Sequence, residues 1–294
     1  MDIFGIPLQA FLGQLTLGLV NGSFYAMLSL GLAVIFGLLG IVNFAHGALY
    51  MIGAYVAWGS LEYFGLNYWA ALALAPLVVG VLGMLIERTL LKRLYKIDPI
   101  YGLLLTFGLA LIAEGLFRDQ FGVSGQQYPV PESLQGATNL GFMVLPNYRA
   151  FVVLASLVVC FGTWFVIERT RLGSYLRAGT ENPALVQAFG INVPMMVMLT
   201  YAAGAGLAAI AGVLAAPIIQ ITPLMGSNLI IVVFAVVVIG GMGSIMGSIL
   251  TGLVLGLVEG LTKVFYPEAS NIVVFVIMAI VLVLRPAGLF GKEK

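Results

Sequence analysis

Few residues in this chain have side chains that could perform chemistry. His46 is the only histidine and Cys160 the only cysteine among 294 residues, so the sequence offers no His/Cys metal cluster. Cys160 lies inside an apolar run, where packing is its expected role, and it has no second cysteine for an internal disulfide. No GxxxxGK[ST] loop is present, so we expect no P-loop nucleotide site. These residues predict a chain that is not an enzyme and holds neither a cofactor nor a metal.

Two pairs of opposite charge have helical spacing. Glu114 and Arg118 are four residues apart, as are Glu259 and Lys263, which predicts same-face ion pairs near helix ends. We interpret both pairs as interface anchors in preference to substrate ligands. No Asp, Glu, Lys or Arg is predicted in the middle of an apolar segment. Because a proton- or sodium-coupled carrier usually needs an intramembrane carboxylate, this pattern argues against secondary transport.

Two polar or glycine-rich breaks interrupt apolar sequence. The first is Ile41-Val42-Asn43-Phe44-Ala45-His46-Gly47 and the second is Gly240-Gly241-Met242-Gly243-Ser244. Non-helical backbone at membrane depth is tolerated only where it lines a cavity or is buried in protein. One interpretation therefore places His46 on a translocation pathway, and the other makes it a hydrogen-bonded structural residue at a helix end. The amino-acid sequence alone leaves both interpretations of His46 open.

The stretch Glu168–Pro194 is polar, with Arg169, Arg171 and Arg177 close together between two very apolar segments. Positive charge of this kind marks the cytoplasmic side of a membrane protein. Within it the residues predict a short helix from Pro183 to Phe189.

Local signals define both ends of this short helix. Asn182 is suited to the N-cap, Pro183 to the first helical position, and Gly190 to the C-terminal end. The apolar residues on one side of the helix are expected to be Leu185, Val186 and Phe189. Such an exposed apolar face predicts a contact with another protein.

Composition assigns the chain to the integral membrane proteins. It is 61% hydrophobic and only 9% charged, with a mean hydropathy of +1.10, whereas a soluble domain has about 25% charged residues. Charges are confined to a few places between apolar runs of membrane-spanning length, which favours helices over a β-barrel. The net charge of +1 gives no indication of nucleic-acid binding.

Apolar runs predict about nine membrane crossings. The run from Phe11 to Gly40 is too long for one straight span, and Asn21-Gly22-Ser23 is expected to interrupt it. Residues 118–149 form an expected external loop, and 168–194 an expected cytoplasmic loop. The predicted fold is therefore an all-α polytopic bundle of about eight to nine transmembrane helices with broken helices, in a single domain over residues 1–294.

Small residues and a weak repeat suggest how the helices associate. GxxxG spacings occur at Gly18/Gly22, Gly243/Gly247 and Gly252/Gly256/Gly260, and we expect packing within the chain more often than between subunits. Residues 33–55 and 235–256 share a layout of apolar run, glycine-containing break and small-residue helix. Repeats with broken helices are common in transporters.

Three blocks of sequence together resemble a known family. The blocks are GLLGIVNFAHGALYMIGAY, RAGTENPALVQAFGINVPMMVMLTYAAGAGLAAIAGVLAAP and VVVIGGMGSIMGSILTG. They resemble the permeases of branched-chain amino acid ABC transporters, most closely the H-type subunit, over nearly the whole chain. The resemblance implies a multi-pass protein of the bacterial inner membrane. It also implies a second permease, two cytoplasmic ATPase subunits and a periplasmic binding protein as partners.

The resemblance also implies roles for particular residues. The segment from Glu181 to Gly190 matches the loop by which such permeases contact the ATPase, in a divergent form in which Asn182 and Pro183 replace two alanines. The implied contact residues are Glu181, Asn182, Pro183, Leu185, Val186, Phe189 and Gly190. We expect the translocation pathway near Asn43, His46, Gly47, Gly241, Gly243 and Ser244.

The implied function is ATP-driven import of leucine, isoleucine and valine. Close relatives of this family carry urea, short amides or other amino acids, and the sequence does not show which of these substrates this chain carries. A secondary carrier or channel that acts without ATPases is the alternative from a different class.

Overall fold

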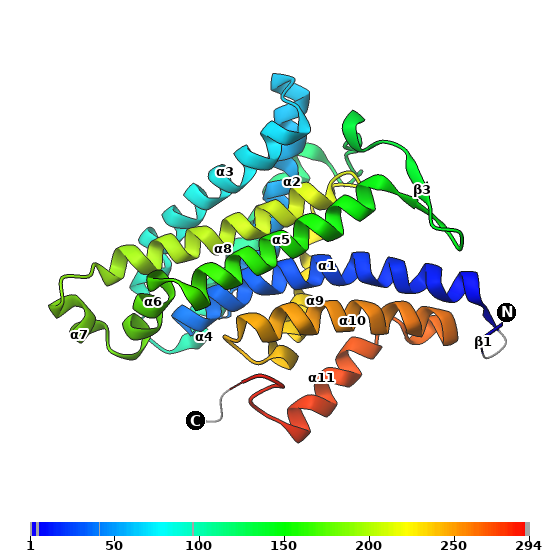
Figure 1. Ribbon diagram of the computed structural model, residues 1–294. Coiled ribbons are helices and arrows are strands. Elements are labelled where there is room, and N and C mark those ends of the chain that lie inside the picture. The colour runs from blue at the N-terminus through cyan, green and yellow to red at the C-terminus, as the bar shows by residue number, and fades with distance from the viewer. Residues whose placement is uncertain (1, 4–5, 41, 96, 292–294) are drawn as a thin grey trace. The chain divides into compact units, whose positions relative to one another are not determined.

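The computed structural model describes residues 2–3, 6–40, 42–95 and 97–291 of the chain. Helices dominate these residues (Figure 1). The α-helices are α1 (Leu8–Leu39), α2 (Ala45–Phe64), α3 (Tyr68–Thr89), α4 (Pro99–Phe121), α5 (Asn147–Arg169), α6 (Arg171–Glu181), α7 (Pro183–Ala188), α8 (Val193–Ala215), α9 (Met225–Gly240), α10 (Ile245–Phe265) and α11 (Val273–Leu284).

Short elements complete the fold. The 3-10 helices are η1 (Leu91–Arg93), η2 (Glu132–Leu134) and η3 (Pro267–Ala269). The strands β1 (Asp2–Ile3) and β2 (Ile6–Pro7) form one antiparallel hairpin, and β3 (Ala137–Asn139) and β4 (Val144–Pro146) form another, with Thr138 opposite Leu145. The helical class is thus confirmed, with two small hairpins that the sequence did not predict. The predicted 118–149 loop is shorter, because α4 continues to Phe121 and α5 begins at Asn147.

In the described residues, eight apolar helices and α2 lie where the sequence predicted about eight to nine crossings. In the described part of the chain, six helical segments are long and apolar enough to cross a membrane. They are Leu8–Gly37, Tyr68–Arg93, Pro99–Phe121, Asn147–Arg169, Val193–Ala215 and Ile245–Phe265. Helices α9 and α11 are shorter apolar helices, and α2 has 20 residues. The chain is therefore a polytopic helical membrane protein.

The expected interruption of the first apolar run at Asn21-Gly22-Ser23 was wrong. Helix α1 is continuous over 32 residues. The Ser23 hydroxyl donates to the Val20 carbonyl at 2.7 Å, which is compatible with helical backbone. Gly22 lies against α10, where an added Cβ would be 2.9 Å from the Leu253 carbonyl oxygen. These residues allow close helix packing and do not break the helix.

Polar side chains cap several helices at the residues where local sequence favours a start. Asn67 accepts a hydrogen bond from the Ala70 amide at 2.9 Å, and Asp98 accepts one from the Ile100 amide at the same distance. Asn192 accepts from the amide of Met195 at 3.1 Å. Each cap satisfies an amide that has no partner inside the helix. The boundaries of these helices are therefore set locally.

The chain forms two compact units. The first comprises Met1–Ser29, Pro129–Cys160 and Val232–Lys294, and the second comprises Leu30–Tyr128 and Phe161–Ile231. Helices α1, α5 and α9 each contribute residues to both units.

In the first unit, glycines bring α1 and α10 into backbone contact (Figure 1). A Cβ added to Gly256 would lie 2.2 Å from the Gly22 Cα, and one added to Gly18 would lie 2.6 Å from the Gly256 carbonyl oxygen. Tyr25 also donates to Glu259 across this pair at 2.6 Å. The expectation that these GxxxG spacings serve packing within the chain is confirmed.

In the second unit, α2, α3 and α8 pack together by the same means. A Cβ added to Gly53 of α2 would lie 2.4 Å from the Ala209 Cα of α8, and one added to Gly212 would lie 2.2 Å from the Tyr50 carbonyl oxygen. On α3, Gly83 faces Ala205 of α8. Small residues thus allow α8 to approach both α2 and α3 closely.

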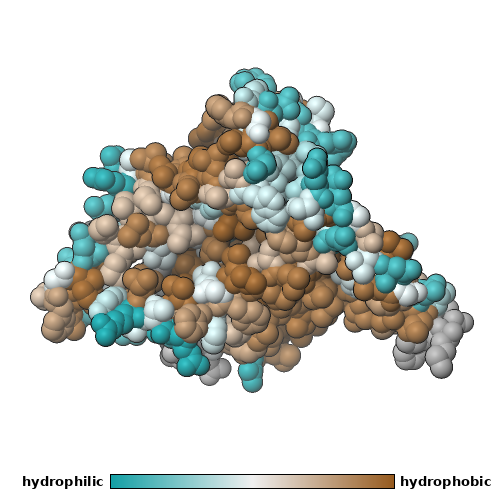
Figure 2. Space-filling view, turned by 45° about the horizontal axis from the view of Figure 1, so that its top comes forward, coloured by the Kyte–Doolittle hydropathy of each residue, from teal (hydrophilic) through white to brown (hydrophobic). Residues whose placement is uncertain are grey.

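Hydrophobic side chains also cover much of the outer surface. Figure 2 shows broad brown areas on the visible face, with hydrophilic residues gathered in separate patches. The exposed residues of α4 include Leu104, Leu111 and Leu116, and α5 exposes Leu154 and Val158. Apolar exposure of this extent suits contact with lipid or with another membrane subunit.

We expect Gly256→Ala to destabilise the protein, whereas Gly13→Ala in α1 does not. Alanine ordinarily favours a helix over glycine, but at Gly256 its methyl group would clash with backbone, an overpacking penalty of about 1–3 kcal/mol. At Gly13 nothing lies within 4 Å of an added Cβ. Thermal unfolding of the purified chain in detergent measures both. An unchanged midpoint for Gly256→Ala would contradict the packing described here.

Candidate functional site

The break between α1 and α2 is the first part of the candidate site. Gly40 follows α1 with a φ of +63°, and its amide donates to the Phe36 carbonyl at 2.9 Å. Ile41 lies outside the described residues, and residues 42–44 are not helical. Helix α2 then begins at Ala45, so His46 and Gly47 belong to its first turn. The predicted break is confirmed and is shorter than expected.

Side chains of α4 and α8 hold this break. Thr106 of α4 donates to the Val42 carbonyl at 3.3 Å and accepts from the Phe44 amide at 3.2 Å. The Asn43 amide nitrogen donates to the Tyr201 hydroxyl of α8 at 3.0 Å. The non-helical backbone thereby finds partners inside the protein, as it must at membrane depth. Asn43 is buried, and within the described structure its Oδ1 has no hydrogen-bond partner.

His46 is fully buried against α1 and α8. A Cβ added to Gly31 would lie 2.8 Å from the His46 Cε1 and 3.1 Å from the Gly204 carbonyl oxygen. The imidazole therefore fills the space that a glycine leaves in α1. This burial favours the interpretation of His46 as a structural residue. His46 nevertheless lies beside the break, next to the candidate site.

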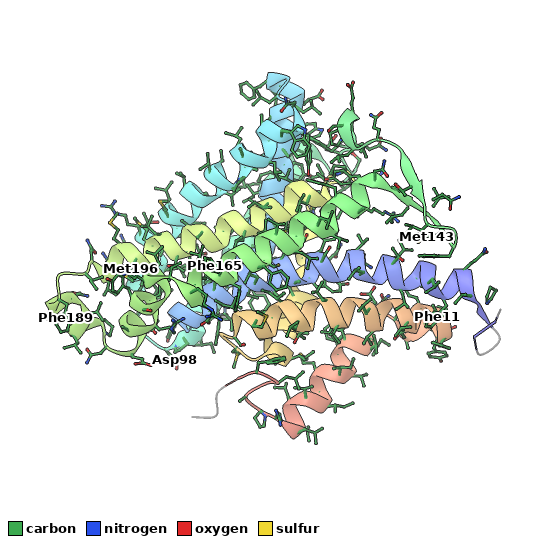
Figure 3. All side chains as sticks on the ribbon, viewed as in Figure 1. Phe11, Asp98, Met143, Phe165, Phe189 and Met196 are labelled. Atoms are coloured by element: carbon green, nitrogen blue, oxygen red, sulfur yellow. The ribbon has the colours of Figure 1, made fainter. Side chains whose placement is uncertain are left out.

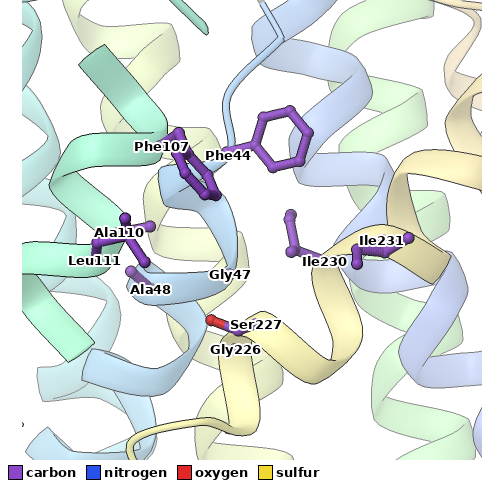
Figure 4. Close-up of a pocket in the computed structure, with 10 residues that line it drawn as sticks. All are labelled: Phe44, Gly47, Ala48, Phe107, Ala110, Leu111, Gly226, Ser227, Ile230 and Ile231. Atoms are coloured by element: carbon purple, nitrogen blue, oxygen red, sulfur yellow. The ribbon is translucent and has the colours of Figure 1, made fainter. Parts of the chain in front are cut away.

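A pocket of about 140 Å³ opens beside the break in the second unit (Figure 4). Its walls come from the break and first turn of α2, from α4, and from the start of α9. The lining residues are Phe44, Gly47, Ala48, Phe107, Ala110, Leu111, Gly226, Ser227, Ile230 and Ile231.

The lining of the pocket is almost entirely apolar. The rings of Phe44 and Phe107 meet edge to face at 6.1 Å between centroids at one end. Ser227 lies at the other end with its hydroxyl oxygen directed toward α2 (Figure 4). Gly47 and Gly226 touch backbone to backbone, since a Cβ at Gly226 would lie 2.2 Å from the Gly47 carbonyl oxygen. Of the predicted pathway residues, only Gly47 lines this pocket. The other lining residues carry no sequence signal that would have identified the pocket.

The second break lies in the first unit, between α9 and α10. Gly241 and Gly243 have φ angles of +99° and +87°, which favour glycine, and the Ser244 hydroxyl accepts from the Gly247 amide at 3.1 Å. The amide of Leu289 donates to the Ile239 carbonyl at 2.8 Å. The C-terminal segment thus pairs with the end of α9, and both breaks share the layout of helix, left-handed glycine and helix.

Residues 168–194 form two helices, where the sequence predicted one. Helix α6 was missed, because its residues were interpreted only as a charged segment. Arg177 of α6 forms an ion pair with Glu168 at 3.3 Å and donates to the Ile167 carbonyl at 3.2 Å near the end of α5. Both charged groups are about half exposed, so the pair stabilises the turn only slightly.

Helix α7 confirms the predicted short helix to within one residue. Asn182 accepts from the Leu185 amide at 3.0 Å, and Gly190 has a φ of +81°. The side chains of Leu185 and Phe189 are exposed, and Phe189 lies at the outer end of the loop (Figure 3). Val186 is buried, so the expectation that it shares the exposed apolar face was wrong. Helix α7 packs against α6 and α8.

The other predicted contact residues are all accessible. Glu181, Asn182, Pro183 and Gly190 are exposed. Together with Leu185 and Phe189 they form one continuous segment of the second unit. The described structure therefore presents six of the seven predicted residues to solvent.

Buried carboxyl groups correct a second sequence expectation. Glu114 and Glu259 are buried within spanning helices, although the sequence suggested exposed interface anchors. Glu259 forms the predicted ion pair with Lys263, at 2.5 Å. No ion pair within 4.0 Å joins Glu114 to Arg118 in the described part of the chain, and Glu114 Oε1 has no partner there.

A third carboxyl group, Glu87, is buried at the end of α3. The Tyr95 hydroxyl donates to it at 2.7 Å. Burial raises the pKa of Tyr95, and the hydrogen bond to Glu87 raises it further, so this phenol stays protonated. Glu87 and Tyr95 lie close to Tyr201, which extends the buried polar contacts of the break toward η1. In the residues that the structure describes, no three His, Cys, Asp or Glu residues form a metal-binding group.

These features define the class of the protein as a multi-pass helical membrane protein with broken helices and an apolar pocket beside one break. A family model described as "Branched-chain amino acid transport system / permease component" matches residues 14–282. The chain belongs to this permease family.

Individual relatives agree over nearly the full length. The chain is 31% identical to the high-affinity branched-chain amino acid transport system permease protein BraD of Pseudomonas aeruginosa, over 97% of each chain. It is 28% identical to the permease protein LivH of Escherichia coli K12, over 97% of this chain and 96% of LivH. It is also 27% identical to LivM of that organism, over 92% of this chain and 68% of LivM. No solved structure is a significant match.

We expect Tyr201→Phe to destabilise the protein by about 1–3 kcal/mol, because the amide of Asn43 then loses its buried partner. Tyr266→Phe is the matched control, since Tyr266 is exposed. Thermal unfolding of the purified proteins measures the difference. Equal stability of the two variants would show that the Asn43–Tyr201 contact does not hold the break.

Proposed function

We propose that this chain is one transmembrane subunit of an ATP-driven importer for leucine, isoleucine and valine. The observation that carries this proposal is the family match over residues 14–282 together with relatives named for branched-chain amino acid transport. The apolar pocket beside the α1–α2 break supports it, because its lining suits an aliphatic group. The chain contains no P-loop motif, so the ATP is hydrolysed by separate subunits.

The second permease is proposed to be a different chain. Relatives of this protein include both LivH and LivM, which shows that one family supplies two kinds of permease. The proposed cellular location of the chain is the cytoplasmic membrane, which is the inner membrane in a bacterium with two membranes. A binding protein on the outer side delivers the substrate, and two ATPase subunits bind on the inner side.

The proposed ATPase contact is the exposed segment from Glu181 to Gly190. Arg169, Arg171 and Arg177 precede it and indicate the cytoplasmic side. Leu185 and Phe189 present an apolar surface, and the buried Val186 fixes α7 to its neighbours. Movement of the ATPases is transmitted through α7 to α5, α6 and α8. Phe189 is more exposed than Leu185 and is proposed as the anchor.

The proposed translocation pathway includes the two breaks, with Asn43, His46 and Gly47 at one and Gly241, Gly243 and Ser244 at the other. Buried Asn43 and His46 act by holding the first break in its conformation. Small residues at both breaks allow neighbouring helices to move during alternating access.

Uptake tests the proposed substrate. We expect a strain that lacks its own branched-chain importers to accumulate labelled leucine when it carries this chain with its second permease, ATPases and binding protein. Omission of the ATPases should abolish the uptake. Labelled urea and acetamide serve as competing substrates. Uptake of urea or acetamide in place of leucine would contradict the proposed substrate, and uptake without ATPases would identify a secondary carrier.

Phe189→Ala should weaken the association with the ATPase by about 30-fold, because truncation of a central aromatic anchor costs about 2 kcal/mol. Phe64→Ala is the control, since Phe64 is 77% exposed and Phe189 is 78% exposed. Copurification of the ATPase and leucine uptake are measured for both variants. Normal copurification and uptake with Phe189→Ala would remove Phe189 from the contact.

A further inference from the structure

The pocket beside the first break is large enough for a small aliphatic group. A cavity of about 150 Å³ lined by apolar residues accommodates benzene. The pocket here has a volume of about 140 Å³, and nine of its ten lining residues are apolar or glycine. A branched side chain of three or four carbons is smaller than benzene. Size and lining therefore suit the side chain of valine, leucine or isoleucine.

Glu114 lies one helical turn beyond this pocket on the same face of α4. Ala110 lines the pocket, and Glu114 follows it by four residues, a rise of about 6 Å. Side chains of a helix lean toward its N-terminus, so Glu114 leans from its own turn toward the turn of Ala110. The buried positions of α4, which are Gly102, Thr106 and Glu114, confirm that this face turns inward.

The Glu114 carboxyl group has an unsatisfied oxygen. Glu114 is 8% exposed, and its Oε1 finds no hydrogen-bond partner in the described structure. Nearby on α2, the ring of buried Tyr55 contacts that of Phe117, the residue three positions after Glu114, in a tilted arrangement at 4.7 Å between ring centroids. The Tyr55 hydroxyl also lacks a partner within the described residues. Buried polar groups almost always have partners, and an ionisable residue inside the membrane is by default a candidate functional residue, so the unpartnered Oε1 makes Glu114 a candidate for contact with a ligand.

We propose that the pocket and Glu114 together bind an α-amino acid, with its branched side chain in the pocket and its ammonium group at the Glu114 carboxyl group. Four bonds separate the ammonium nitrogen of leucine from a terminal methyl, about 5 Å, so one leucine molecule is long enough to reach from the pocket to a group that lies within one helical turn of Ala110. A lipid chain could also fill an apolar pocket but would leave the carboxyl group without a partner. This inference rests on the proposed function and adds the residues that select the substrate.

Direct binding tests the proposal. The complete importer, without its binding protein, is purified and titrated with labelled leucine, and 4-methylpentanoate, which lacks the ammonium group, competes. We expect leucine to bind at least tenfold more tightly than 4-methylpentanoate. Glu114→Gln should weaken leucine binding at least tenfold and remove this discrimination. This ligand comparison on the unmodified protein does not depend on how any variant folds.

Filling the pocket provides a second test. Ala110→Leu and Ala48→Leu place added carbons in the space for the substrate side chain, so leucine binding and uptake should fall at least tenfold. Gly115→Leu is the control, because nothing lies within 4 Å of an added Cβ there, and Asp119→Asn is the control for Glu114→Gln. Both controls should transport leucine normally.

The outcomes separate this inference from the proposed function. If the importer takes up leucine but both pocket-filling variants bind and transport it normally, the pocket does not hold the substrate side chain and the inference is overturned. Equal binding of leucine and 4-methylpentanoate, or no leucine binding by an importer that transports it, overturns the inference as well. If the importer transports urea or acetamide and no branched-chain amino acid, the proposed function fails and the inference fails with it.

Discussion

In an apolar membrane interior, each backbone N–H and C=O group must find its partner within the protein. The break before α2 meets this constraint through Thr106, which donates to the Val42 carbonyl and accepts from the Phe44 amide, and through Tyr201, which accepts from Asn43. The other features of the candidate site depend on these contacts. They place Phe44 and Gly47 at the wall of a pocket and set where α2 begins, and therefore how α2 meets α4 and the start of α9.

Close approach of helices is the second requirement, and glycine meets it in both units. The contact of Gly22 with Gly256 joins α1 to α10, and the contact of Gly47 with Gly226 joins α2 to α9. At the second break, the C-terminal segment supplies the missing hydrogen bonds, as Leu289 and Phe290 donate to the last carbonyls of α9. The two breaks are thus stabilised by different parts of the chain, although a glycine with a positive φ angle follows the preceding helix at each.

The proposed transport role assigns different tasks to polar and apolar surfaces. The exposed Leu185 and Phe189 suit a protein contact, because α7 is held by the buried Val186 and by its cap at Asn182. The apolar pocket suits an aliphatic side chain, and Glu114 is proposed to contact the ammonium group that distinguishes an amino acid from a hydrocarbon. A rigid exposed helix and a pocket of small residues are both compatible with a subunit that is moved by a separate ATPase.

The amino-acid sequence by itself determined the helical membrane class, nine apolar segments, both breaks and the short helix α7, because hydropathy, caps and left-handed glycines act within a few residues. It did not determine whether Asn21-Gly22-Ser23 would break a helix, since that depended on α10 packing against Gly22. Helix α6 was missed because its residues were interpreted only as a charged segment. The burial of Val186, the burial of Glu114 and the pocket, by contrast, were decided by tertiary structure. Each depends on contacts between residues far apart in the chain, and local patterns carry no information about such contacts.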